Sequence, residues 1–482
     1  MKESSEVVQN ADLHASDSEG PGIYCSVCAA PNSVIDRHCV GCWSSLATVL
    51  TSQEEASALR RRLLARRLVR QLAHWSALGL VLTFLIVYAQ GNLVSSVVPS
   101  PSGFTNSAAG LGTWSLSGRD VAHSAWVTNE PLLKGDLAWR FEGGQRLTAG
   151  PVVAGGSVYQ TTWNERIVAL DVLTGALLWE FPVLGPVDGS PALTDTSVYA
   201  GFRSGRFVSL ERETGHLLWS VELGHSIFAS PTVSAGVVYV ATHSGEVFGL
   251  DAHTGRALWS LDVGGGVNAA PVISGKFLVV TSIEGVVHIL DLTTGEKRLD
   301  YSIRQNVLST PAFLGNVLIV ATDEGNLLAL DATKVEYLFE RMLRRFRSQW
   351  FLWGLQDTPP TPKGFLWSRP LERDSKATSP AIADGRAYIV STGGILHSVD
   401  VVTGDLYWAY DAGSPTKRRV APVVAGDFVY MATIFGEVHV VDRIRGDLVK
   451  MFTIEAEPSA QLVVADGTLY IPGEDGSLTS IR

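Results

Sequence analysis

A repeat of about 40 residues constrains the fold of this chain more than any other feature. Five prolines recur at equal intervals, at Pro151, Pro191, Pro231, Pro271 and Pro311. Three further copies begin at Pro380, Pro422 and Leu462. Repeats of this length stack on one another, because a single unit cannot bury its own apolar face. The eight copies therefore predict one large repetitive domain over residues 114–482.

Each copy reads as four short strands separated by glycine-containing turns. The most regular turn has the pattern Asp-x-x-Thr-Gly, as in residues 171–175, 251–255 and 400–404. Asp accepts hydrogen bonds from the backbone ahead of it, and Gly takes the positive φ that the turn needs. A Trp follows four residues after the glycine, at Trp179, Trp219, Trp259 and Trp408. We expect these large rings to pack between neighbouring sheets.

The combined pattern A-x-D-x-x-T-G-x-x-x-W resembles the PQQ-like (pyrroloquinoline-quinone-type) repeat, and residues 169–179 are its closest copy. The resemblance implies an all-β, eight-bladed β-propeller. Residues 114–123 look like the lead-in segment of such propellers. Members of this family include quinone-dependent dehydrogenases, a propeller subunit of the bacterial outer-membrane assembly machinery, and extracytoplasmic sensor domains.

The ends of the repeat array indicate a closed ring. The eighth copy lacks its outer strand, whereas residues 136–141, ahead of the first copy, form such a strand without a unit. Joining the two would complete the last blade and remove the exposed sheet edges. We therefore expect a closed propeller rather than an open solenoid.

Blade five contains an insertion over residues 333–363, where the Thr-Gly turn is lost. Apolar residues there recur every three or four positions, which predicts an amphipathic helix. The residues predicted to contact a partner or membrane are Arg341, Arg344, Arg345, Arg347, Trp350 and Trp353. Three alternatives remain open from the sequence: the helix packs on its own propeller, docks on a partner subunit, or lies in a membrane interface.

All four cysteines lie near the N-terminus, in two C-x2-C pairs: Cys25 with Cys28, and Cys39 with Cys42. Four thiolates complete a closed tetrahedral Zn²⁺ site, which is typical of a structural metal rather than a catalytic one. The segment 21–46 resembles the small zinc ribbons of bacterial membrane proteins, after a disordered stretch at 1–20. The alternative is a set of unrelated reduced cysteines.

Residues 72–95 carry no charge and are long enough to cross a bilayer as a helix. Arginines crowd the preceding segment 52–71, predicted to be a basic juxtamembrane helix, and the linker 96–113 has none. This asymmetry predicts a cytoplasmic N-terminus and an extracytoplasmic propeller, in the inner membrane. A cleaved signal peptide or a buried core helix would be the alternatives.

The net charge of −10 argues against nucleic acid as a partner. No motif for a nucleophile, a phosphate loop or a calcium loop is present, so the sequence predicts neither catalysis nor bound PQQ. We expect a non-enzymatic scaffold or accessory subunit that binds other proteins of a membrane complex. An extracytoplasmic ligand sensor that signals to the zinc ribbon and a PQQ-dependent dehydrogenase are the alternatives.

Overall fold

The computed structural model describes residues 114–482, except 129, 164, 184, 336–339, 356, 358–359 and 373–374. It also describes short stretches of the preceding part, namely 23–26, 31–32, 49–50, 54–59, 61–66, 69 and 79. The chain separates into two compact units, Met1–Gly103 and Phe104–Arg482. Each unit is treated by itself below.

The first unit contains a small antiparallel sheet of three strands, in the order β2-β1-β3. These strands are β1 (Ile23–Cys25), β2 (Pro31–Asn32) and β3 (Val49–Leu50). Residues 54–59 and 61–66 are helical. In the part of the chain that the structure describes, no helix has both the length and the apolar character needed to cross a membrane. The predicted span at 72–95 lies outside the described residues, apart from Gly79.

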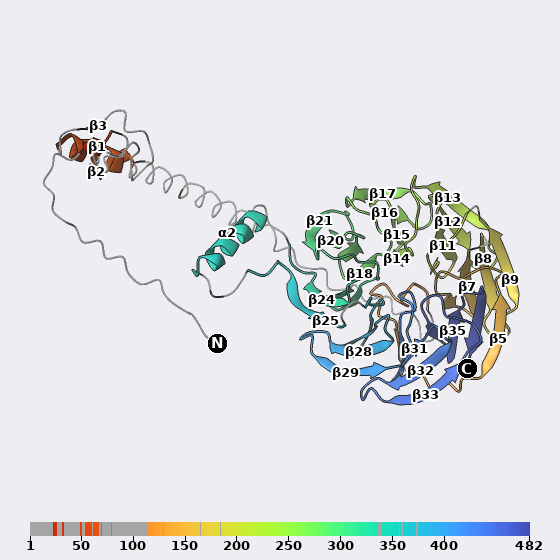
Figure 1. Cartoon of the computed structure of the whole chain (residues 1–482). Helices are drawn as coiled ribbons and strands as arrows, with labels where there is room; N and C mark the ends of the chain where they lie inside the picture. Colours follow the sequence, from red (N-terminus) through yellow and green to blue (C-terminus); the bar gives the residue numbers. More distant parts are fainter. Residues whose placement is uncertain are drawn as a thin grey trace, which may run out of the picture. The chain divides into compact units, whose positions relative to one another are not determined.

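The second unit is a ring of eight antiparallel sheets, as Figure 1 shows, which confirms the predicted eight-bladed propeller. Blade one contains β6 (Val152–Ala154), β7 (Ser157–Thr162), β8 (Arg166–Asp171) and β9 (Leu177–Pro182). Blade two contains β10 (Ala192–Leu193), β11 (Ser197–Gly201), β12 (Arg206–Glu211) and β13 (Leu217–Glu222). Blade three contains β14 (Thr232–Ser234), β15 (Val237–Ala241), β16 (Glu246–Asp251) and β17 (Ala257–Asp262). Blade four contains β18 (Val272–Ser274), β19 (Phe277–Thr281), β20 (Val286–Asp291) and β21 (Lys297–Ser302).

The remaining blades follow the same order, with two additions. Blade five contains β22 (Ala312–Leu314), β23 (Val317–Ala321), β24 (Asn326–Asp331) and β25 (Phe365–Pro370), with α2 (Glu340–Leu352) between β24 and β25. Blade six contains β26 (Ala381–Ala383), β27 (Arg386–Val390), β28 (Ile395–Asp400) and β29 (Leu406–Asp411). Blade seven contains β30 (Val423–Ala425), β31 (Phe428–Ala432), β32 (Glu437–Asp442) and β33 (Leu448–Thr453), and β4 (Trp126–Val127) pairs with β30. Blade eight contains β34 (Val463–Ala465), β35 (Thr468–Pro472), β36 (Ser477–Ile481) and β5 (Leu137–Glu142).

Blade eight closes the ring with strands from distant parts of the sequence. β5 pairs antiparallel with β36, with Trp139 opposite Ser480. Figure 1 shows the orange β5 beside the dark-blue C-terminal strands. Because this pairing leaves the propeller without an open first or last sheet, the closure predicted from the incomplete eighth repeat is confirmed.

Where an outer strand carries the repeated Trp, the ring packs on the glycine of the turn between the third and fourth strands of the next blade. Trp179 Nε1 donates a hydrogen bond to Arg212 O at 3.0 Å. Its ring also covers Gly215, where φ is +73° and an added Cβ would lie 2.6 Å from the ring. Glycine is thus required twice over, for its backbone conformation and for the space that the ring occupies. The predicted packing of Trp between sheets is what the structure shows.

Two outer strands lack Trp, and each faces a blade that lacks the turn. Leu299 in β21 faces blade five, where the insertion replaces the Thr-Gly turn, and its side chain packs against Gly364. Lys450 in β33 faces blade eight, where β36 and β5 are not joined by a turn, and its Nζ donates to Lys134 O. Trp is therefore absent where its docking surface in the neighbouring blade is absent.

Candidate functional site

The channel through the ring is closed on one face by the segment 114–127, which we call the plug. Its first residue pairs with blade one, where Trp114 N donates to Val153 O at 2.7 Å. At the other end, Gly426 N of blade seven donates to Val127 O at 2.9 Å. Between these ends, plug carbonyls accept backbone N–H groups from the inner strands of further blades, at Leu193, Ile273, Phe313, Ile382 and Val424. The channel is therefore a blind cavity with the plug as its floor.

His123 forms part of this floor and is almost completely buried. Its Nε2 lies 3.5 Å from Ser117 Oγ, and within the described residues its Nδ1 has no hydrogen-bond partner. Burial lowers the pKa of His123 to about 4, so the ring is neutral at neutral pH. Gly118, with φ +69°, lies against the ring, and an added Cβ would approach it to 2.3 Å. The plug turn thus depends on a glycine beside this histidine.

Hydroxyl groups line the wall of the cavity. Each belongs to the residue that directly precedes the proline at the start of a repeat. Ser230 Oγ, Thr310 Oγ1 and Ser379 Oγ, which we call the hydroxyl belt, each accept a backbone N–H from the preceding blade. The distances are 2.9, 3.3 and 2.9 Å. These bonds connect the blades around the channel. The cavity has a volume of about 160 Å³.

Four arginines lie at the mouth of the cavity. Three of them are paired with carboxylates: Arg203 with Asp188 (2.5 Å), Arg418 with Asp323 (3.1 Å) and Arg146 with Glu474 (3.0 Å). The fourth, Arg419, forms no ion pair among the described residues, and its Nη1 donates to Thr148 O at 3.4 Å. Burial lowers the pKa of Arg419, with smaller contributions from the three neighbouring arginines.

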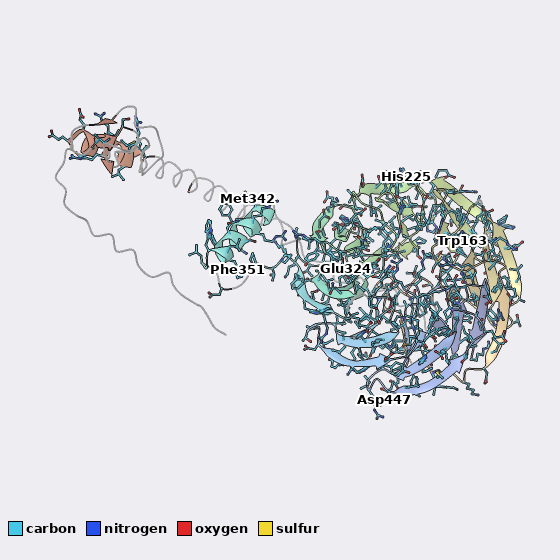
Figure 2. All side chains as sticks on the ribbon, viewed as in Figure 1. Trp163, His225, Glu324, Met342, Phe351 and Asp447 are labelled. Carbon is cyan, nitrogen blue, oxygen red and sulfur yellow. The ribbon has the colours of Figure 1, made fainter. Side chains whose placement is uncertain are left out.

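Aromatic rings support the arginines on the blade one and blade two side of the mouth. Trp163, on the turn between β7 and β8 and labelled in Figure 2, lies 5.4 Å from the Arg203 guanidinium. Phe228 lies 5.0 Å from the same guanidinium. Because Asp188 also binds both Arg203 Nε and Nη2, this arginine is held in one position.

PQQ, the quinone after which the repeat is named, does not fit this cavity. Its volume of about 160 Å³ is well below the ~300 Å³ at which pockets for organic ligands of that size begin. Asp188 is the one carboxylate among the residues lining the cavity, and Arg203 engages both of its oxygens. The lining residues therefore supply neither an available carboxylate base nor a set of oxygen ligands for Ca²⁺.

The predicted zinc site is only partly within the described residues. Cys25 is buried at the end of β1, whereas Cys28, Cys39 and Cys42 lie outside the described residues. The Zn²⁺ ribbon stays a prediction.

The predicted contact residues of the insertion lie on or next to α2, which carries Met342 and Phe351 (Figure 2). Met342, Phe346 and Trp350 form an apolar stripe, and their exposed fractions are 46%, 53% and 48%. Trp353 follows the helix and is 67% exposed. Arg344, Arg345 and Arg347 are also exposed, whereas nothing is described of the Arg341 side chain.

A pocket of about 810 Å³ separates α2 from the outer strand of blade four. Leu343, Arg344 and Arg347 line it on the helix side, and Asp300 and Tyr301 line it on the strand side. Arg344 and Arg347 lie on a different side of α2 from Met342 and Phe346, because successive residues are about 100° apart on a helix. Met342, Phe346 and Trp350 stay about half exposed.

Sequence reasoning picked out residues 114–123 as a lead-in segment but not as a plug, and it missed the hydroxyl belt and Arg419. A usable signal was present for the cavity: residues one and two positions before the repeat prolines line the channel, and their polar members stand out once the copies are aligned. No comparable signal indicates that residues 114–127 close the channel, because their backbone follows no repeat.

The fold and the cavity define the chain as a closed eight-bladed β-propeller with a plugged channel. The family described as outer membrane protein assembly factor BamB matches residues 127–263, 262–362 and 360–482. The chain belongs to this family. Membership fits a protein-binding accessory role. No curated protein matches the chain.

Solved structures agree on the fold. BamB from Moraxella catarrhalis is 20% identical, with a TM-score of 0.57, over 73% of this chain and 98% of that one. A computationally designed protein is 17% identical, with a TM-score of 0.58 and the same coverage. Quinohemoprotein alcohol dehydrogenase from Comamonas testosteroni is 14% identical, with a TM-score of 0.60, over 77% of this chain and 80% of that one. At these identities the likeness shows the fold alone.

Proposed function

We propose that this chain is a non-enzymatic, membrane-anchored accessory subunit whose propeller binds partner proteins of a membrane complex. The observation that carries the proposal is α2, a basic helix with an apolar stripe whose side chains stay about half exposed on the propeller. Membership in a family described as an assembly factor supports the same role.

The chemistry of α2 indicates what kind of surface it binds. Apolar side chains that are about half exposed gain free energy when a partner covers them, at roughly 25 cal/mol per Å². The exposed Arg344, Arg345 and Arg347 favour a partner with acidic groups beside an apolar groove. An amphipathic helix laid into such a groove is a common mode of recognition. We therefore assign α2 to the partner-binding surface.

The anchor in this proposal is the segment 72–95, with the propeller outside the inner membrane and the N-terminus in the cytoplasm. The absence of charge over 72–95 and the arginines before it support this orientation. The four cysteines would hold one structural Zn²⁺ in the reducing compartment, where thiolates stay available as ligands.

The test is co-purification of the full-length protein from detergent-solubilised membranes of its own host. Changing Phe346 and Trp350 to Ser should remove a partner that the wild-type protein retains. Leu173→Ser is the matched control, because Leu173 is 64% exposed on a turn of blade one, away from α2. Wild-type protein that migrates as a monomer with nothing bound would contradict the proposal, and so would unchanged co-purification of the stripe variant. Loss of binding to anionic vesicles, with partners retained, would show that α2 lies on the membrane instead.

A quinoprotein dehydrogenase is the second candidate, because quinohemoprotein alcohol dehydrogenase shares the fold. Purified protein mixed with PQQ and Ca²⁺ distinguishes the two. We expect no quinone absorbance after gel filtration and no dye-linked oxidation of alcohols or sugars. Stable quinone absorbance together with turnover would replace the accessory role by an enzymatic one.

A further inference from the structure

Among the ion-paired side chains at the mouth of the blind cavity, taken together with Arg419, cations outnumber carboxylates by one. The cations are Arg146, Arg203, Arg418, Arg419 and Lys417, and the carboxylates paired with them are Asp188, Asp323, Glu457 and Glu474. Lys417 Nζ takes two of these carboxylates, at 2.8 Å from Glu457 and 2.5 Å from Glu474. The remaining charge is that of Arg419, which lines the cavity without an ion-pair partner among the described residues.

A guanidinium in this position is costly unless an anion accompanies it. Asp188 is close enough to interact with Arg419, but both carboxylate oxygens of Asp188 are hydrogen-bonded to Arg203. The single bond from Arg419 to Thr148 O, at 3.4 Å, uses one of five N–H donors. Several donors of Arg419 are therefore free for a group that enters the cavity.

The walls of the cavity add further hydrogen-bond donors. Each hydroxyl of the belt, at Ser230, Thr310 and Ser379, accepts a backbone N–H and so keeps its own hydrogen to donate. Within the described residues, none of these three hydrogens has an acceptor. Gln461 also lines the cavity, and its Nε2 is buried without a partner in the described structure. A ligand that only accepts hydrogen bonds fits this set.

We propose that the blind cavity binds a small oxyanion, a carboxylate or a phosphate, with Arg419 as its countercharge and Gln461 and the hydroxyl belt as further donors. The cavity volume of about 160 Å³ suits a few non-hydrogen atoms rather than a cofactor or a peptide. Charged and bidentate hydrogen bonds from arginine match a pair of oxygens in either ligand type. This site is separate from α2, so it neither requires nor excludes the partner binding proposed above.

The experiment is calorimetric titration of the full-length protein in detergent with inorganic phosphate and, separately, with succinate. We expect saturable binding of at least one of them, and which one binds identifies the anion class. Arg419→Gln should weaken binding by about tenfold or more, since hydrogen bonds to charged groups contribute ~1.5–3 kcal/mol and each 1.4 kcal/mol is tenfold. Arg256→Gln is the matched control, because Arg256 is exposed on a turn at the opposite face of blade three.

A second variant protects the test against misfolding. Gln461→Met keeps the volume of the side chain but removes its amide donor, so it should weaken binding severalfold while leaving the thermal midpoint nearly unchanged. Equal affinity in wild type and in both variants would overturn the proposal, as would a wild-type protein that binds neither phosphate nor succinate. Co-purification of a partner should be the same in Arg419→Gln as in wild type, which separates this result from the test of α2.

Discussion

Acidification should destabilise the propeller through His123, the buried imidazole in the plug. Its pKa is about 4 in the folded protein, because burial disfavours the charged ring, and its ordinary value is 6.5. As the pH falls, His123 therefore takes up its proton at a higher pH in the unfolded chain than in the folded protein. This histidine's contribution to stability is fully present above about pH 6.5 and is lost as the pH falls from there towards 4.

The magnitude follows from the two pKa values. A difference of one pKa unit corresponds to about 1.4 kcal/mol, so the full difference amounts to about 3 kcal/mol when both states are protonated. At pH 5 the unfolded state is almost fully protonated and the folded state is almost fully neutral. The loss of unfolding free energy at pH 5, relative to about pH 7.5, is then ~2 kcal/mol from this one residue. His123 is 3% exposed, so solvent screening does not reduce this value much.

The assay is urea denaturation of wild type and His123→Asn at about pH 7.5 and pH 5. Asn tolerates the positive φ of 58° at this position and does not titrate in this range. Other acidic groups affect both proteins alike, so wild type should lose ~2 kcal/mol more than the variant between the two pH values. An equal loss in both proteins would refute the reasoning. A His123 resonance that titrates near 6.5 in the folded protein would do the same.

Three further predictions concern the ring and the N-terminal unit. Gly175→Ala should reduce the free energy of unfolding by about 2 kcal/mol or more, because φ is +70° and the new Cβ would lie 2.6 Å from the Trp139 ring. Thermal unfolding measures this change, and an unchanged stability would contradict the prediction. Leu299→Trp should destabilise by about 1–3 kcal/mol and Leu299→Met by less, since the larger ring would overfill a buried site where the insertion of blade five replaces the Thr-Gly turn. Elemental analysis of the full-length protein should find one Zn²⁺ per chain, lost in Cys39→Ser; a metal-free wild type would reject the ribbon.

The blade number and the ring closure were predictable because each blade repeats the same turn chemistry. In the turn between β8 and β9, Asp171 Oδ1 accepts hydrogen bonds from Thr174 Oγ1 and from the Thr174 backbone N–H, each at 2.8 Å. These hydrogen bonds, the side-chain one first, lower the pKa of Asp171. The outer strand with Trp139 was recognisable for the same reason. It has the Trp-containing pattern of an outer strand, although the other three strands of its blade lie at the C-terminal end of the chain.

The plug and the cavity were not predictable in the same way. Residues 114–127 have almost no regular secondary structure, and their conformation is set by contacts with six blades that lie far away in the sequence. Arg419 is one of many arginines in the chain. That Arg419 has no ion-pair partner among the described residues can be recognised only when the partners of Arg203 and Arg418 are known. Pairing among distant side chains leaves no local pattern.

The plug also determines how the propeller responds to mechanical load. A pull on the chain ahead of Trp114 does not reach the outer strand β5 first, because the plug is bonded to inner strands around the channel. The load falls first on the backbone hydrogen bonds between Trp114 and Val153, at 2.7 and 2.8 Å. Tension from that direction would therefore have to break the hydrogen bonds between the plug and six blades, one after another, before it could separate β5 from β36 and open the ring.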